Sequence, residues 1–152
     1  MKTINIHNVH AYARKLMDKY GLFSWTFKLD RAKKRAGLCR FRPQIISLSH
    51  YFVTLNEDDE IIDVILHEIA HVIAGPNENH GFRWKHACGL VGAKVRRCAL
   101  NAIMPNGKYT AYCLNCNKKH YRHRMPKLLP EEYMHCIACG SEKGKLTFSL
   151  EN

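Results

Sequence analysis

The stretch from Asn56 to Pro76 reads NEDDEIIDVILHEIAHVIAGP, and it decides the fold. Four carboxylates at 57–60 open it and suit the positive end of a helix dipole, with Asn56 as the expected N-cap. Apolar residues cover most sides of the turns that follow, and Gly75-Pro76 supplies a stop signal. Because a helix that is apolar on most sides is buried, this stretch predicts the central helix of a domain.

Two histidines stand in this helix at a spacing of four, in the sequence His67-Glu68-Ile69-Ala70-His71. Residues four apart lie on one helical face, so His67 and His71 can direct two imidazoles at one zinc ion. Glu68 lies about 100° further round and approaches the open side of the metal. Since polar groups among isoleucines need a compensating partner, the pattern predicts a zinc site.

A catalytic zinc site normally uses three protein ligands and leaves the fourth position to water. Asn77 occupies the position six residues after His71, where metzincins carry their third histidine, so that class is excluded. His80 follows the turn at Gly75 and opens the next predicted helix, from which it can face back to the first. It is the favoured third ligand, and His86 is its competitor.

Four of the seven cysteines form two Cys-x-x-Cys pairs separated by 19 residues, which is the spacing of a zinc ribbon. Four thiolates close a tetrahedron without room for water, so this zinc is predicted to be structural. The predicted ligands are Cys113, Cys116, Cys136 and Cys139. Three histidines could replace a cysteine in a mixed site: His120, His123 and His135. The remaining cysteines, Cys39, Cys88 and Cys98, are expected to be small buried apolar residues.

The segments around the central helix predict a small α+β domain. Amphipathic spacing predicts a helix over residues 9–20, and alternation predicts strands over 23–29, 38–42 and 45–49, which would form a small antiparallel sheet. A second helix is expected to end near Gly92, with Phe82, Ala87, Leu90 and Val91 on its apolar side. A turn at 105–108 separates this domain, 1–104, from the cysteine pairs in 105–152.

Charge suggests a polyanionic partner. Lys and Arg number 24 against 13 Asp and Glu, which gives a net charge of +11, and such a surplus attracts phosphate backbones. One basic cluster is Arg31, Lys33, Lys34 and Arg35, with Arg40 and Arg42. A second combines cations with an aromatic ring that suits an unpaired base, and comprises Lys118, Lys119, Tyr121, Arg122 and Arg124. The alternative for both is a solvated basic face or a localisation signal.

No apolar stretch is long enough for a membrane span or an export signal. The expected location is therefore cytoplasmic or nucleoid-associated, or nuclear if the source is a eukaryote or one of its viruses, and no membrane partner is expected.

These residues together resemble the SprT family of zinc metallopeptidases, which includes the animal protein Spartan. The motifs that carry the resemblance are RAKKRAGLC at 31–39, ISLS at 46–49, HEIAH at 67–71, HGFRW at 80–84 and the cysteine pairs. The resemblance implies a compact α+β, zincin-like metallopeptidase core followed by a small β zinc ribbon. It implies one catalytic zinc held by His67, His71 and His80, with Glu68 as the acid and base, and one structural zinc.

The resemblance also implies a substrate class, because characterised relatives are DNA-stimulated proteases that act on proteins crosslinked to DNA. The expected partners are single-stranded or structured DNA and the proteins bound to it, which indicates a part in DNA–protein crosslink repair. The rival function is a non-catalytic, zinc-stabilised nucleic-acid-binding or regulatory module. Glu68 argues against the rival, since structural zinc needs no carboxylate at that point. Candidates for stabilising the oxyanion are His50, Tyr51 and Arg83.

Overall fold

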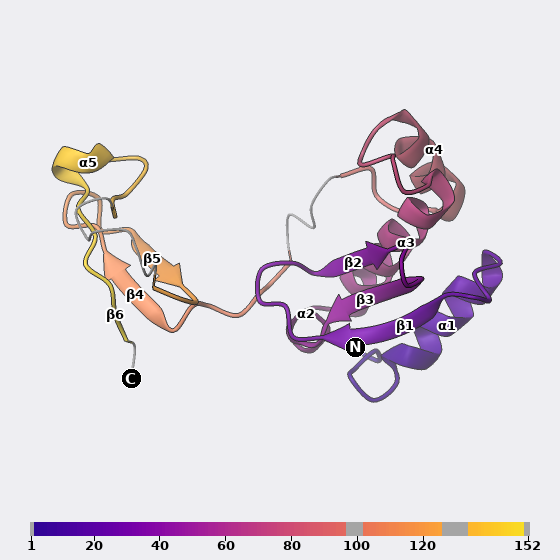
Figure 1. The fold of residues 1–152 in the computed structure, drawn as a ribbon. Helices are drawn as coiled ribbons and strands as arrows, with labels where there is room; N and C mark the ends of the chain where they lie inside the picture. The colour runs from indigo at the N-terminus through magenta and orange to yellow at the C-terminus, as the bar shows by residue number, and fades with distance from the viewer. Residues whose placement is uncertain (1, 97–101, 126–133, 151–152) are drawn as a thin grey trace. The chain divides into compact units, whose positions relative to one another are not determined.

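The computed structural model describes residues 2–96, 102–125 and 134–150. Contacts within the chain divide it into two compact units, Met1–Pro105 and Asn106–Asn152, whose elements are labelled in Figure 1. Of the predicted features, Cys98 lies outside the described residues.

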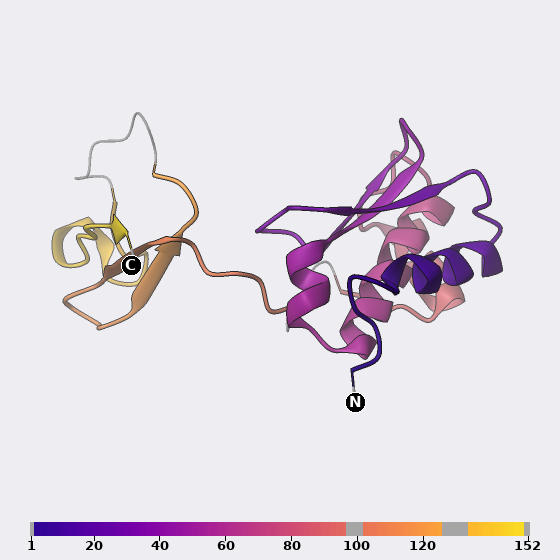
Figure 2. The ribbon, with the colours of Figure 1, turned by 90° about the horizontal axis from the view of Figure 1, so that it is seen from below.

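The first unit combines helices with a three-stranded sheet, so the predicted α+β class is confirmed. Its elements, in chain order, are α1 (Val9–Lys19), β1 (Thr26–Asp30), β2 (Gly37–Arg40), β3 (Ile45–Ser49), α2 (His50–Leu55), α3 (Asp58–Ala74) and α4 (Phe82–Val91). Figure 2 shows α1 and α3 on the same face of the sheet. The helix α3 is central, as predicted, and contacts α1, α4, β2 and β3.

The sheet is mixed, so the prediction of an antiparallel sheet was wrong in one of its two pairings. The strand order is β1-β3-β2, with β2 antiparallel and β1 parallel to β3. The loop 31–36 leads from β1 to β2, which is not the neighbour of β1 in the sheet. The turn at 41–44 then places β3 between these two strands. The strand β3 is buried at four of its five positions, which explains why it takes the centre.

The start of α3 differs from the prediction. Glu57 occupies the N-cap position and makes no side-chain cap hydrogen bond. Asn56 is instead the C-cap of α2 and is buried, with its amide bonded to the backbone of Phe52 and Ile103. The bonds to Ile103 join positions 47 residues apart, which local cap signals do not reveal.

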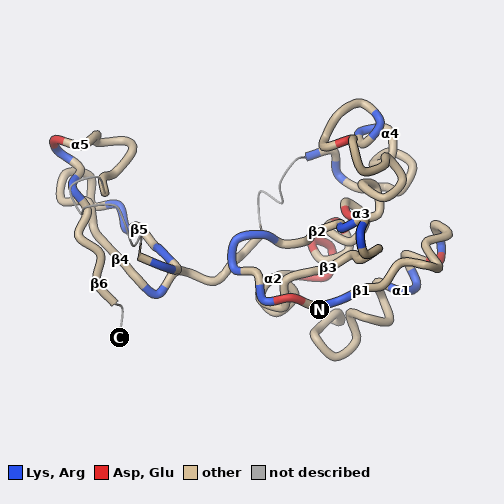
Figure 3. The backbone as a smooth tube through the Cα atoms, viewed as in Figure 1, with Lys and Arg blue, Asp and Glu red and all other residues tan. Residues whose placement is uncertain are grey.

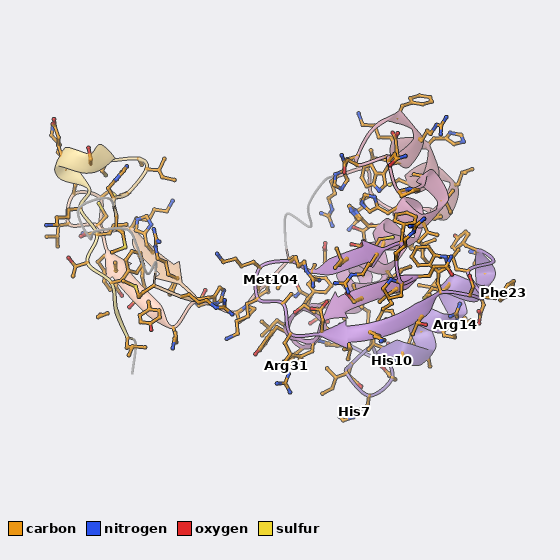
Figure 4. All side chains as sticks on the ribbon, viewed as in Figure 1. His7, His10, Arg14, Phe23, Arg31 and Met104 are labelled. Carbon is orange, nitrogen blue, oxygen red and sulfur yellow. The ribbon has the colours of Figure 1, made fainter. Side chains whose placement is uncertain are left out.

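Three apolar residues that were predicted to face the core are exposed. Phe23 lies in a turn before β1 and points to solvent (Figure 4), because the Arg14 guanidinium holds that turn by donating to the carbonyls of Leu22 and Trp25. In α4, Phe82 and Leu90 are exposed. The predicted residues Ala87 and Val91 are buried, and Trp84 and Cys88 complete the buried face of that helix.

The second unit is built from short elements around a small core. They are β4 (Tyr109–Tyr112), β5 (Lys119–Arg122), α5 (Gly140–Lys143) and β6 (Ser149–Leu150), and the sheet order is β5-β4-β6. Its buried apolar residues are Ala111, Cys113, Met134, Cys136 and Leu146. A small β unit with cysteines in its core is consistent with the predicted zinc ribbon.

The described residues contain no helix with both the length and the apolar character that crossing a membrane requires.

Candidate active site and metal sites

Three histidines converge at the junction of α3 and α4. The Nε2 atom of His67 lies 3.2 Å from that of His71 and 3.4 Å from that of His80. The ligand atoms of the three residues all lie within 4.8 Å of one another. The competitor His86 is exposed on α4 and does not belong to this group.

The spacing of these nitrogens suits a tetrahedral zinc. Zn–N distances of about 2.0–2.1 Å in a tetrahedron place two ligand atoms about 3.3 Å apart. The two separations from His67, 3.2 Å and 3.4 Å, bracket that value. This group of three histidines could therefore hold a zinc ion.

Trp84 supports all three imidazoles. Its ring centroid lies 4.9 Å from that of His67, 5.6 Å from that of His71 and 4.6 Å from that of His80. The ring of His71 also donates a hydrogen bond to the backbone carbonyl of Glu78, which fixes the orientation of that imidazole. Sequence reasoning noted Trp84 only as part of a motif and missed this supporting contact.

Burial keeps two of the three histidines neutral. It lowers the pKa of His67 to about 4, and the nearby rings of His71 and His80 add to the effect. Burial, followed by the neighbouring His80, also lowers the pKa of His71 to about 4. Neutral imidazole is the form that binds a metal, so these two side chains are ready to coordinate at neutral pH.

Glu68 lies beside the histidines and is only 6% exposed. Its burial raises the pKa of the carboxyl to about 8, against the opposing effects of the Arg35 charge and a hydrogen bond from the Cys39 backbone N–H. The strand β2 packs closely here, because a Cβ at Gly37 would lie 2.6 Å from the Oε1 atom of Glu68. These contacts between β2 and α3 were not anticipated from the sequence.

A cavity of about 540 Å³ contains this site. Its lining includes residues of α3, β2 and the loops beside them: His67, Glu68, His71, His80, Lys34, Arg35, Asn79, Gly37, Leu38 and Cys39. The three oxyanion candidates, His50, Tyr51 and Arg83, do not line it. The ring of Tyr51 is 4.1 Å from that of His50 and lies under the Lys33 ammonium. The polar side chains available beside Glu68 are therefore different from those that the sequence suggested.

Four cysteines converge in the second unit. The sulfurs of Cys113, Cys116, Cys136 and Cys139 form one group within 4.8 Å, without any of the three histidine alternatives. Tetrahedral zinc with Zn–S bonds of about 2.3 Å separates two sulfurs by about 3.8 Å. The Sγ atoms of Cys116 and Cys136 are 3.8 Å apart, so this group could hold zinc too.

Backbone hydrogen bonds favour the thiolate form of Cys113. The backbone N–H of Cys116, followed by that of Asn115, lowers the pKa of Cys113 to about 7. The Nδ2 atom of Asn115 also lies 3.3 Å from the sulfur of Cys139. Donors aimed at the sulfurs are typical of an outer shell around a zinc ribbon.

The other two cysteines that the structure describes, Cys39 and Cys88, belong to no such group. Cys88 is buried in the core, as expected, whereas Cys39 is half-buried and lines the cavity that contains the three histidines.

The first basic cluster lies mostly in the loop 31–36 between β1 and β2, drawn in blue in Figure 3. Arg31, Lys33 and Lys34 are exposed. Arg35 is half-buried and pairs with Asp30 at 2.9 Å, so part of its charge is neutralised within the unit.

The second basic cluster lies on and around β5. Lys119 sits over two aromatic rings, 5.5 Å from the centroid of Tyr112 and 5.1 Å from that of Tyr121. Arg122 lies over the ring of Phe148. The remaining members, Lys118 and Arg124, are exposed. Sequence reasoning missed Tyr112, which the register of β4 and β5 brings opposite Lys119.

Residues 6–103 match the profile of the SprT-like family, which covers more than half of the chain. The chain belongs to the SprT-like family. Membership confirms the resemblance seen in the sequence, and it assigns a metallopeptidase-like fold to the unit that holds the three histidines. No curated protein and no solved structure matches this SprT-like chain.

Proposed function

We propose that this SprT-like protein is a zinc-dependent endopeptidase, stimulated by DNA, that acts on proteins bound or crosslinked to DNA. The observation that carries the proposal is the meeting of three imidazoles and one buried carboxylate in a single cavity. A purely structural metal site would need neither the carboxylate nor the open cavity.

The chemistry divides between the metal and Glu68. Zinc held by His67, His71 and His80 would act as a Lewis acid on the scissile carbonyl and make water a stronger acid. Glu68 takes the proton from the attacking water and delivers it to the leaving amine. Burial raises the pKa of this carboxyl above its ordinary value, toward the range in which a carboxyl can both accept and release a proton.

The proposed link to DNA is supported by charge and by aromatic rings. Three exposed cations, Arg31, Lys33 and Lys34, lie in the loop that leads into the cavity wall at 34–39. In the second unit, the Lys119 ammonium lies close to the exposed rings of both Tyr112 and Tyr121. Cations bind phosphates, and exposed aromatic rings stack on unpaired bases, so single-stranded DNA is the favoured form.

The test is cleavage of a basic DNA-binding protein by the purified, zinc-loaded chain. Single-stranded DNA should accelerate cleavage, and a chelator should abolish it. The substitution Glu68→Gln should reduce the rate by at least about a hundredfold, because it removes the group that moves the proton. Zinc content of the variant, measured by atomic absorption, should stay the same as in the wild type.

Glu57→Gln is the matched control, since Glu57 is an exposed glutamate at the start of the same helix and lies outside the cavity. It should cleave at the wild-type rate. DNA binding without chelator-sensitive cleavage would reject the peptidase and favour the non-catalytic nucleic-acid-binding module.

A further inference from the structure

The active-site cavity extends beyond the histidines to apolar side chains that the proposed chemistry does not use. Ala102 and Met104 line it, together with Val64 of α3. Both Ala102 and Met104 are half-buried and pack against the core of the first unit. In Figure 4, Met104 lies toward the same end of the sheet as Arg31.

The segment 102–104 presents alternate residues to the cavity. Ile103, between the two lining residues, is 58% exposed and does not line the cavity. An extended chain points successive side chains in opposite directions, which accounts for this pattern. One side of the segment therefore belongs to the cavity wall, and the other faces solvent.

Asn56 fixes this wall with a pair of hydrogen bonds to one residue. Its Nδ2 atom donates to the carbonyl of Ile103 at 2.8 Å, and its Oδ1 atom accepts from the Ile103 N–H at 2.7 Å. A further bond from Nδ2 reaches the carbonyl of Phe52 at 2.8 Å. Because Asn56 is buried, it cannot release these partners without leaving polar groups unsatisfied.

We propose that Ala102 and Met104 form a specificity subsite for an apolar side chain of the polypeptide substrate, and that Asn56 is the positioning residue of this wall. This subsite rests on the proposed peptidase function and gives the same cavity a preference for substrates with an apolar side chain. A flexible thioether adapts to apolar groups of several shapes, whereas a charged side chain placed against this wall would lose hydration.

The two cations that line the same cavity, Lys34 and Arg35, are compatible with an apolar substrate side chain. Lys34 is exposed and keeps its ammonium in reach of water. Arg35 is paired with Asp30 at 2.9 Å.

The test compares two metal-binding probes on the zinc-loaded full chain by calorimetric titration. Acetohydroxamate offers only the metal-binding group, whereas 4-methylpentanohydroxamate adds a branched alkyl chain. The wild type should bind the second probe about tenfold more tightly, which is a normal discrimination for an apolar pocket. Met104→Asp should remove that preference and leave the affinity for acetohydroxamate unchanged.

Ile103→Asp is the matched control, because it makes the same kind of change in the same segment on the solvent side. It should keep the tenfold preference. Asn56→Asp keeps the acceptor for the Ile103 N–H but loses the donors, so it should weaken the preference and leave acetohydroxamate binding intact. If Asn56→Asp fails to fold, comparison of Met104→Asp with Ile103→Asp still tests whether the apolar subsite exists.

Equal affinity of the wild type for both probes, or an unchanged preference in Met104→Asp, would overturn the subsite alone. Failure of the zinc-loaded protein to bind acetohydroxamate would overturn the proposed function and the subsite with it. Peptide cleavage, measured in parallel, distinguishes failure of the subsite from failure of the proposed function, because only the second predicts that cleavage is absent.

Discussion

At Gly37 a side chain of any size would collide with the carboxylate on which the proposed chemistry depends. A Cβ at this position would lie 2.6 Å from the Oε1 atom of Glu68 and 2.9 Å from the Cγ1 atom of the buried Val64. We therefore expect Gly37→Ala to displace Glu68 and to lower kcat by about tenfold to a hundredfold. Zinc affinity, measured by competition with a chromophoric chelator, should change little because the histidines are untouched.

Gly89 provides the control for this substitution. It lies in α4, and a Cβ there would meet no atom within 4 Å. Gly89→Ala should leave kcat unchanged and stabilise the helix by roughly 0.5–1 kcal/mol. If both variants cleave at the wild-type rate, close packing of β2 against Glu68 is not required.

The sequence predicted those residues of the candidate site that lie close to one another along the chain. His67, Glu68 and His71 are fixed by the period of one helix, and His80 could be reached by eliminating other donors. The contacts of Glu68 with Gly37 and Cys39 could not be predicted, because they join two elements some 30 residues apart in the chain. The oxyanion candidates failed for the same reason, since no local pattern says which side chains face a cavity.

At the scale of elements, Asp58 ties the N-terminal segment to the first turn of α3. Its carboxylate accepts a hydrogen bond from the Thr3 hydroxyl and one from each backbone N–H of Thr3 and Ile4, the latter two at 2.8 Å. These bonds, the one from the Thr3 side chain first, lower the pKa of Asp58 below its ordinary value of 3.8. An acid with a lowered pKa stabilises the fold above that value and loses its contribution as the pH falls through the folded-state pKa.

We therefore expect Asp58→Asn to lower Tm at pH 7 and to have a smaller effect below about pH 3. Asp59→Asn is the control, because it removes an exposed charge from the same helical turn. Calorimetry at both pH values measures the difference. Equal losses of Tm in the two variants would show that the effect comes from the helix dipole and not from the hydrogen bonds of Asp58 to Thr3 and Ile4.

The order of the elements was predicted better than their pairing. Periodicity located α1, the three strands, α3 and α4, because amphipathic patterns follow from local geometry. It did not reveal α2 or the central place of β3, which depends on where the loop 31–36 carries the chain. Short-range turn signals indicate a hairpin but not which strand a third segment will join.

The two units differ in what holds them together. The first packs a broad core that includes Phe52, Ile65 and Trp84. In the described part of the second unit the buried apolar cluster is small, and Cys113 and Cys136 belong to it. We therefore expect a chelator to unfold the second unit and to leave the helices of the first unit folded. Amide hydrogen exchange, resolved by peptide, measures protection in each unit.

A single-residue version of this experiment avoids effects of the chelator itself. Cys136→Ser should remove protection from the second unit even with zinc present. Cys39→Ser, which changes a cysteine of the first unit, should leave that protection intact. Protection that survives both the chelator and Cys136→Ser would show that packing alone folds the second unit.

At the scale of the whole molecule, each unit has exposed cations of its own. Arg31, Lys33 and Lys34 lie in the first unit, and Lys118 and Arg124 lie in the second. Cations alone attract double-stranded and single-stranded nucleic acid alike, with affinities that fall as salt rises. Selection of single strands requires aromatic rings that unpaired bases can reach, and the rings beside Lys119 meet that requirement.

Tyr121→Ala should therefore weaken binding of the whole chain to an oligo(dT) strand by about 1–3 kcal/mol, the usual loss for one stacked base. The dependence of affinity on salt should stay the same, because no charge is removed. Tyr12→Ala is the matched control, since Tyr12 is 40% exposed and Tyr121 is 41% exposed. Fluorescence anisotropy over a series of salt concentrations measures both quantities. Equal affinities of the two variants would show that the bases do not stack on Tyr121, and a flattened salt dependence would show that its loss disturbs the cations instead.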